Sequence, residues 1–190
     1  MKVILVTGAN KGIGQAIVKR LLAEFPDTHL LLGSRDKQRG DTAVQELLTD
    51  LGSAVKPRLE MLQLDVGDDQ SVAAAVAFVK EKFGSLYGLV NNAGGWLSTD
   101  RDTIQLNAFS VVRVCEAFAP LLETNGSFTF IIYLGLTCNP RSDSPDILSL
   151  GTELCGEMLR RSSEDAGQGG RHLYGGRVQG YQTLPQHQGR

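Results

Sequence analysis

Short apolar runs and longer amphipathic stretches alternate along the first 135 residues of the chain. Each run is rich in Val, Ile, Leu or Phe and has the length of one buried strand in a parallel sheet. The stretches between them repeat their apolar residues every three or four positions, as amphipathic helices do. The runs that predict strands span 2–7, 29–35, 58–66, 86–94 and 127–135, and the stretches that predict helices span 15–25, 41–52, 69–84 and about 102–123.

The helix patterns carry signals for their faces and ends. Ile13 and Leu21 fall on one apolar stripe of the first helix, and Pro26 ends that helix. Asp69 or Ser71 is placed to cap the third helix, because both side chains accept hydrogen bonds from free backbone N–H groups.

Strand and helix alternate five times without a break, which requires parallel strands, right-handed crossovers and helices on both faces. The predicted fold class is therefore α/β, a doubly wound parallel sheet of the Rossmann type. We assign a dinucleotide-binding domain to residues 1–140. Residues 141–190 are rich in Gly, Gln and Arg and lack apolar periodicity, so they predict an irregular, largely disordered tail.

Composition and charge narrow the range of partners. The 190 residues are 42% hydrophobic, and their formal net charge of −2 gives no electrostatic reason to bind nucleic acid or an anionic membrane. Three cysteines form neither a disulfide framework nor a metal-ligand cluster, so we expect no metal and a reduced, cytoplasmic setting. No stretch has the pattern of a signal peptide or the length of a membrane span, so no membrane contact is expected.

The stretch VTGANKGIG, residues 6–14, connects the first predicted strand to the first predicted helix. Gly8 allows a tight exit from the strand, Gly12 lets the backbone approach a pyrophosphate, and Gly14 lets the helix pack closely on the sheet. The helix N-terminus then directs free N–H groups and a partial positive charge at the anion. The turn predicts nucleotide binding, and a tight strand-to-helix loop without a ligand is the alternative.

Several motifs together resemble one enzyme family. TGANKGIG at residues 7–14, NNAG at residues 91–94 and a following helix with Asn107 resemble the short-chain dehydrogenase/reductases. GSRDKQRG after the second strand and LDV after the third make the chain most similar to the carbonyl-reductase branch, over about residues 1–135. The resemblance implies an oxidoreductase that uses NADP(H) to reduce a small-molecule carbonyl to an alcohol.

The resemblance also implies which residues would bind NADP(H). The glycine turn would hold the pyrophosphate and the adenosine ribose, the loop after the third strand would flank the adenine ring, and the NNAG motif would lie along the nicotinamide ribose. The positions concerned are Gly8, Asn10, Lys11, Gly12, Ile13 and Gly14 in the turn, Asp65 and Val66 in the loop, and Asn92, Ala93 and Gly94 in the motif. Asn107 would be a catalytic residue. Without the resemblance, these are ordinary turn, surface and helix residues.

Two arginines bear on the choice between NADP(H) and NAD(H). NAD-binding folds place a carboxylate at the end of the second strand to accept the ribose 2′-hydroxyl. Here that place holds Arg35, with Arg39 four residues further on, and a guanidinium suits a 2′-phosphate. The carbonyl-reductase branch has basic residues at both positions. The alternative is two solvated charges, and Asp36 is placed to pair with Arg35.

The family's catalytic pattern is incomplete here. Family members place a serine at the end of the fifth strand and a Tyr-x-x-x-Lys pair on the next helix, whose tyrosine protonates the developing alkoxide. Ile132 and Tyr133 stand at the serine positions, and no lysine follows Lys82. Tyr174 resembles the tyrosine of the carbonyl-reductase branch, with Val178 at the lysine position. Tyr174 is therefore the candidate acid, and Tyr133 is a strand-end core residue.

Family members also continue into two further strands that this chain does not supply, so the resemblance predicts a sheet truncated at its C-terminal edge. Two function classes follow. The first is an NADPH-dependent carbonyl reductase. The second is a catalytically defective nucleotide-binding remnant or regulator. Consumption of NADPH with a dicarbonyl or a quinone would separate them.

Overall fold

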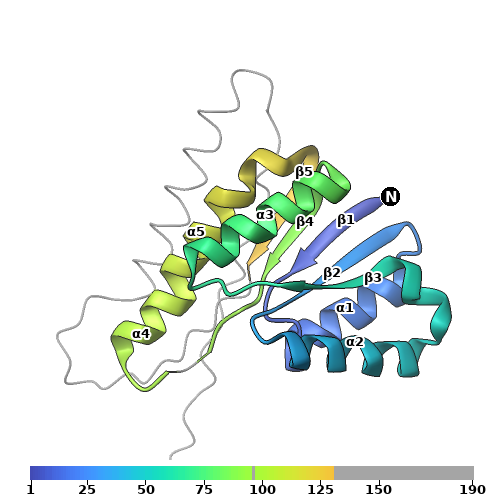
Figure 1. The fold of residues 1–190 in the computed structure, drawn as a ribbon, viewed down its shortest axis with the longest axis horizontal. Coiled ribbons are helices and arrows are strands. Elements are labelled where there is room, and N and C mark those ends of the chain that lie inside the picture. Colours follow the sequence, from blue (N-terminus) through green and yellow to red (C-terminus); the bar gives the residue numbers. More distant parts are fainter. Residues whose placement is uncertain (96, 131–190) are drawn as a thin grey trace, which may run out of the picture.

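The computed structural model describes residues 1–95 and 97–130, which form a five-stranded parallel sheet with helices on both faces (Figure 1). The strands are β1 (Lys2–Val6), β2 (Thr28–Ser34), β3 (Leu59–Gln63), β4 (Leu86–Asn91) and β5 (Leu122–Phe130). The helices are α1 (Gly12–Glu24), α2 (Lys37–Leu51), α3 (Asp69–Phe83), α4 (Asp100–Ile104) and α5 (Ser110–Phe118), with 3₁₀ turns η1 (Ser53–Arg58) and η3 (Ala119–Leu121) and a π-turn η2 (Gln105–Phe109). The predicted fold class is confirmed. The predicted tail at 141–190 lies outside the described residues.

The strand order is β3-β2-β1-β4-β5, so the direction of winding reverses between β3 and β4. As a result β1 and β4 are neighbours, with Ile4 opposite Gly88 and Val6 opposite Val90. In open α/β sheets, ligands bind beyond the carboxyl ends of the strands at such a reversal. The reversal therefore brings the glycine turn after β1 beside the NNAG motif at the end of β4.

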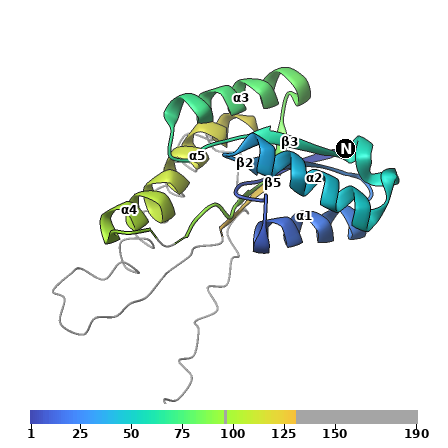
Figure 2. The same ribbon diagram turned by 60° about the horizontal axis from the view of Figure 1, so that its bottom comes forward.

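Residues of β1, β2, β3 and β4 divide between two separate apolar clusters, one on each face of the sheet, and those of β1 alternate strictly. Val3 and Leu5 belong to the cluster that includes residues of α3 and α5, whereas Ile4 and Val6 belong to the cluster that includes residues of α1 and α2. This division follows from the two-residue period of a strand. Figure 2 shows the same layers, with α3 and α5 on one side of the sheet and α1 and α2 on the other.

The predicted single helix at 102–123 is wrong in its continuity and its ends. The structure divides it into α4, the π-turn η2, α5 and η3, and β5 already begins at Leu122. In the π-turn the N–H and the hydroxyl of Ser110 both donate to the carbonyl oxygen of Gln105, five residues back, which widens the helix at that point. Pro120 lies at the start of η3, where its missing N–H prevents continuation of the α-helix.

Two helix details also differ from expectation. Ile13 is 53% exposed, because Gly14 rather than Ile13 lies on the buried face of α1. Asp68 caps α3, in place of Asp69 or Ser71, by accepting a 3.1 Å bond from the backbone N–H two residues further on. Both differences are small. The buried position of α1 moves by one residue, and the cap of α3 lies one residue before Asp69 and three before Ser71. Helix ends in particular are defined by sequence only to within one or two residues.

His29 on β2 is a buried titratable residue at the opposite end of the sheet from the glycine turn. It is 7% exposed and lies 3.7 Å from the carboxylate of Glu60, and neither ring nitrogen has a hydrogen-bond partner among the described residues. Burial lowers the pKa of His29 below its ordinary value, Lys82 and Arg58 lower it further, and Glu60 opposes the shift in part. His29 is therefore neutral in the folded protein at neutral pH.

We expect the free energy of unfolding to fall as the pH drops below about 6.5, because the unfolded chain then binds a proton that folded His29 binds less readily. Each pH unit between the two pKa values costs at most about 1.4 kcal/mol. Urea unfolding at pH 7.5 and 5.5 measures the loss. His29→Leu should lose less stability over that interval than the wild type, and equal losses would contradict the expectation.

Candidate functional site

The candidate site lies beyond the carboxyl ends of β1 and β4, where the turn at residues 7–11 leads into α1 (Figure 1). Thr7 connects the two strand ends. Its backbone N–H donates to the carbonyl oxygen of Val90 at 3.0 Å, and its hydroxyl oxygen accepts from the N–H of Asn92 at 3.0 Å and of Ala93 at 2.9 Å. Thr7 is 1% exposed, so these bonds are screened little by water.

Asn92 completes this connection from the other side. Its side-chain amide donates to the carbonyl oxygen of Thr7 at 2.9 Å and to that of Gly8 at 3.1 Å. The residue is 3% exposed. The amide therefore holds the glycine turn against the end of β4. Contact of Asn92, Ala93 and Gly94 with a nicotinamide ribose stays a prediction.

Gly8 in the turn and Gly14 in the first turn of α1 have no room for a side chain. A Cβ on Gly8, whose φ is 62°, would lie 2.8 Å from the Cα of Ala93. A Cβ on Gly14 would lie 2.4 Å from the Asn92 amide nitrogen and 2.8 Å from the Gly8 carbonyl oxygen. Gly12, in contrast, also has a positive φ of 59° but faces open space, with nothing within 4 Å of such an atom. The backbone is therefore packed on its inner side and accessible at Gly12.

The N-terminus of α1 differs from those of α2, α3 and α4. Asp36, Asp68 and Thr99 cap those three helices with side-chain bonds, whereas Lys11 makes no capping bond to α1. The first N–H groups of a helix need partners, and an anion is a suitable one. Lys11, like Gly12 and Ile13 after it, is exposed, while Asn10 is half-buried.

The two arginines follow β2 at the same edge of the sheet. Arg35 is 77% exposed and its Nε lies 3.9 Å from a carboxylate oxygen of Asp65. Arg39 is 70% exposed, and its Nε lies 3.6 Å from a carboxylate oxygen of Asp36. The expected pairing of Asp36 with Arg35 is wrong, because Asp36 caps α2 through the N–H of Arg39 and so faces that residue. Both guanidinium groups remain accessible to an anion.

The loop after β3 presents Asp65 and buries Val66. The Asp65 carboxylate accepts a 2.9 Å bond from the N–H of Gly67, and the Asp65 N–H donates to the Ser71 hydroxyl at 2.9 Å. The Val66 side chain is 7% exposed and packs in the cluster with α3 and α5. Of Val66, only the backbone is therefore placed to flank an adenine ring. The adenine contact of Asp65 and Val66 stays a prediction.

Asn107 lies in the π-turn η2 and holds the segment that follows β4. Its amide oxygen accepts from the N–H of Gly95 at 3.0 Å, and its amide nitrogen donates to the carbonyl oxygen of Gly95 at 3.1 Å. π-turns within helices are frequent at functional sites. The structure thus brings Asn107 to the same edge as the glycine turn, whereas the candidate acid Tyr174 and also Tyr133 lie outside the described residues.

Comparison with known proteins identifies the family of this chain. The short-chain dehydrogenase family model matches residues 2–134. The chain belongs to the short-chain dehydrogenase family. Carbonyl reductase (NADPH) 1 of Mus musculus is 38% identical over 65% of this chain and 46% of its own length, and (+)-neomenthol dehydrogenase of Arabidopsis thaliana is 36% identical over 65% and 50%. The chain thus spans about half the length of the curated relatives it matches.

Two solved structures agree with this fold. Menthone neomenthol reductase from Mentha piperita has a TM-score of 0.65 at 26% identity, covering 86% of this chain and 76% of the other. An NADPH-bound carbonyl reductase from chicken fatty liver has a TM-score of 0.55 at 30% identity, covering 64% of this chain and 48% of the other. The predicted resemblance over about residues 1–135 is confirmed by these matches and by the family model.

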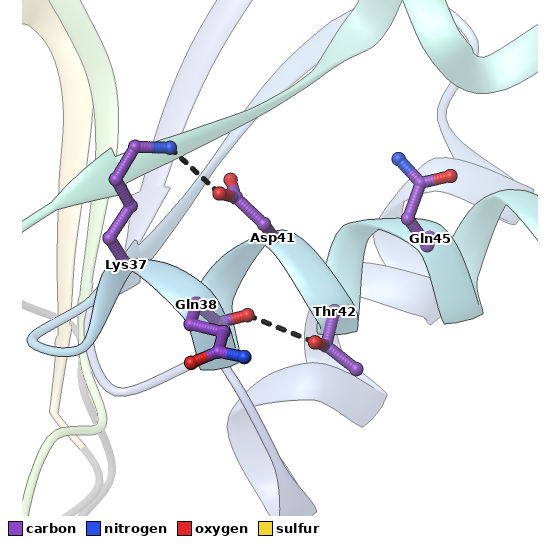
Figure 3. A pocket seen from close by; sticks show the side chains of 5 residues that line it. All are labelled: Lys37, Gln38, Asp41, Thr42 and Gln45. Atoms are coloured by element: carbon purple, nitrogen blue, oxygen red, sulfur yellow. Dashed lines mark hydrogen bonds and ion pairs between the residues drawn. The ribbon is translucent and has the colours of Figure 1, made fainter.

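Two surface hollows of this short-chain dehydrogenase lie away from the candidate site. One, of about 420 Å³, is lined by residues of α2 alone, among them Lys37, whose ammonium lies 2.7 Å from the carboxylate of Asp41 (Figure 3). The other, of about 790 Å³, lies between α2, the edge strand β3 and α3. None of the predicted cofactor-binding residues lines either hollow.

Metal ligands and membrane spans were also sought in the described part of this short-chain dehydrogenase. Within residues 1–95 and 97–130, no three His, Cys, Asp or Glu side chains gather in a way that could hold a metal ion. Over the same residues, every helix is too short or too polar to cross a membrane.

Proposed function

We propose that this chain binds NADPH at the carboxyl edge of its sheet and that it serves an oxidoreductase that reduces small-molecule carbonyls to alcohols. One observation carries the proposal. The glycine turn is braced against β4 by Thr7 and Asn92 and leads into a helix whose N-terminus has no side-chain cap. A pyrophosphate needs this combination of accessible backbone and free N–H groups.

The residues of the site fit the parts of NADPH in order. Gly8, Asn10, Lys11, Gly12, Ile13 and Gly14 would hold the pyrophosphate and the adenosine ribose. Arg35 and Arg39, exposed beside the turn, would bind the 2′-phosphate through charge-assisted hydrogen bonds. Asp65 and the backbone of Val66 would flank the adenine, and Asn92, Ala93 and Gly94 would lie along the nicotinamide ribose. The names of related proteins support this choice, because they include carbonyl reductases that use NADPH.

NADPH, when bound, supplies the hydride that a carbonyl carbon accepts. The described residues of this chain would orient the cofactor: the turn would hold the phosphates, and Asn107 positions the segment after β4 through Gly95. Holding reactants in place can lower an activation free energy by several kcal/mol. In this chain that positioning would depend on the backbone of the glycine turn, which is already ordered in the folded protein.

A second function, a nucleotide-binding protein without turnover, is favoured by one observation. The 190-residue chain carries no lysine after Lys82, so the lysine that lowers the pKa of the family's tyrosine is missing from it. Such a protein would bind NADPH through the same residues. Binding therefore tests what the two functions share, and reduction of a carbonyl separates them.

We expect calorimetric titration to show tighter binding of NADPH than of NADH. Arg35→Ala should cost about 1.5–3 kcal/mol of that preference, roughly ten- to a hundredfold, because a charge-assisted bond to the 2′-phosphate is lost. Arg20→Ala is the matched control, since Arg20 is equally exposed at 77% but lies on the outer surface of α1, paired with Glu24. Equal affinities of the wild type for NADPH and NADH would contradict the assignment.

A further inference from the structure

Arg113 on α5 reaches across to the loop between β3 and α3. Its guanidinium donates to the carbonyl oxygen of Val66 at 3.1 Å and pairs with the carboxylate of Asp69. The side chain is 29% exposed, whereas that of Asp69 is 82% exposed. α3 and α5 lie side by side on one face of the sheet, as Figures 1 and 2 both show. Arg113 therefore ties the loop to a helix far away in the sequence.

The same guanidinium also contacts the end of the π-turn. Its Nη1, which donates to Val66, lies 3.5 Å from the Ser110 hydroxyl oxygen. That hydroxyl in turn donates to the carbonyl oxygen of Gln105 at 3.0 Å. Ser110 is 3% exposed, so its hydroxyl depends on these protein partners. A continuous series of polar contacts thus runs from Val66 through Arg113 and Ser110 to the first residue of the π-turn.

The two ends of this series carry different parts of the candidate site. The loop at residues 65–68 includes Asp65 and the Val66 backbone, which we place beside the adenine. The π-turn includes Asn107, which holds Gly95 beyond β4. These segments belong to different elements, so their relative position depends on contacts between α3 and α5. A planar guanidinium has donors in a rigid arrangement, which suits it to hold two segments at one spacing.

We propose that Arg113 is a positioning residue that holds the loop at 65–68 in a fixed position relative to the π-turn that carries Asn107. The proposal rests on the proposed function, because it gives the two segments their roles at the adenine and nicotinamide ends of one cofactor. The effect of Arg113 reaches the site through Val66 on one side and Ser110 on the other.

Amide hydrogen exchange in the absence of nucleotide tests the link directly. Arg113→Met retains the length of the side chain but loses its donors, so exchange at the N–H groups of Gly67 and Gly95 should accelerate about tenfold relative to that of Leu31 in the sheet core. Arg113→Lys should restore part of the protection at Gly67, and Arg20→Met should change neither. Equal acceleration at Leu31, or acceleration at Gly67 alone, would overturn the proposal.

Titration with NADPH and with adenosine 2′,5′-bisphosphate, which represents the adenine end, tests the consequence for binding. Arg113→Met should weaken both ligands about tenfold, as expected for loss of a positioned contact. Unchanged affinity for both ligands in a folded Arg113→Met protein would overturn the positioning role. A wild type that binds neither ligand would overturn the proposed function instead, and the exchange rates would still decide whether Arg113 links the two segments.

Discussion

The purified 190-residue chain will reduce a dicarbonyl or a quinone with NADPH at least about a thousandfold more slowly than a full-length carbonyl reductase. Under the proposed function the glycine turn and the segment held by Asn107 would still place the cofactor, so a trace of hydride transfer is expected. We expect the proton donor to be the part that limits the rate. An ordinary tyrosine has a pKa near ~10, and lowering it to neutral pH requires about three pKa units, or roughly 4 kcal/mol.

The sequence predicts that this chain lacks the groups that would provide that stabilisation. No lysine follows Lys82, and Val178 stands where the lysine partner of Tyr174 would lie. General acid catalysis typically contributes about 10²–10⁴-fold to a rate. By the resemblance, Ile132 and Tyr133 also stand where the family's serine is expected, and loss of one such donor to a developing oxyanion costs about 10²–10³-fold.

The rate is measured by the loss of NADPH absorbance under saturating cofactor, beside a full-length carbonyl reductase. Tyr174→Phe and Tyr133→Phe show whether either hydroxyl supports the residual activity. A wild-type rate comparable to that of the full-length enzyme would contradict the prediction. Loss of that rate in Tyr174→Phe would then identify Tyr174 as the acid.

Gly14→Ala will weaken NADPH binding at least about a hundredfold and lower the free energy of unfolding by about 1–3 kcal/mol. The added methyl group would lie 2.4 Å from the Asn92 amide nitrogen, 2.8 Å from the Gly8 carbonyl oxygen and 2.9 Å from the Cα of Ala9. Two of these three atoms are backbone, so rotation of one side chain cannot relieve the contact. The start of α1 must move away from β4 and take the free N–H groups with it.

Urea unfolding and calorimetry measure the two effects on the same protein samples. Gly52→Ala is the control, because Gly52 has a positive φ of 83°, open space around it and a position at the far end of α2. That change should cost about 1–3 kcal/mol of stability, because an Ala rarely adopts this backbone conformation, and leave NADPH affinity unchanged. Normal affinity in a folded Gly14→Ala protein would show that close packing of α1 is not required for binding.

The fold could be predicted because its signals are local. Alternation of apolar runs with amphipathic stretches depends on neighbouring residues, and the structure confirms the first four strands and the first three helices. The fifth strand begins at Leu122, five residues before the predicted start, and its predicted end at 131–135 lies outside the described residues. The same reasoning misplaced Ile13, because a glycine can occupy a buried helix face without contributing to a hydrophobic stripe. It also missed the π-turn, whose widening depends on the bonds that Ser110 makes to Gln105.

The supporting contacts of the site could not be predicted in the same way. Thr7 and Asn92 meet because β4 lies next to β1 in the sheet, although 85 positions separate them in the chain. Arg113 meets Val66 because α5 packs beside α3. The motifs indicated which segments would bind a nucleotide. Only the arrangement of strands and helices shows which side chains hold those segments together.

The two apolar clusters on opposite faces of the sheet have an evolutionary consequence. The glycine turn and the arginines after β2 are supported by the layer of α1 and α2, whereas Asn107 and Arg113 are carried by the layer of α4, the π-turn and α5. Substitutions beside the glycine turn and Arg35 can accumulate in the layer of α1 and α2 without repacking the layer of α3 and α5. Under the proposed function, recognition of the ribose phosphate would therefore evolve within one layer of this domain.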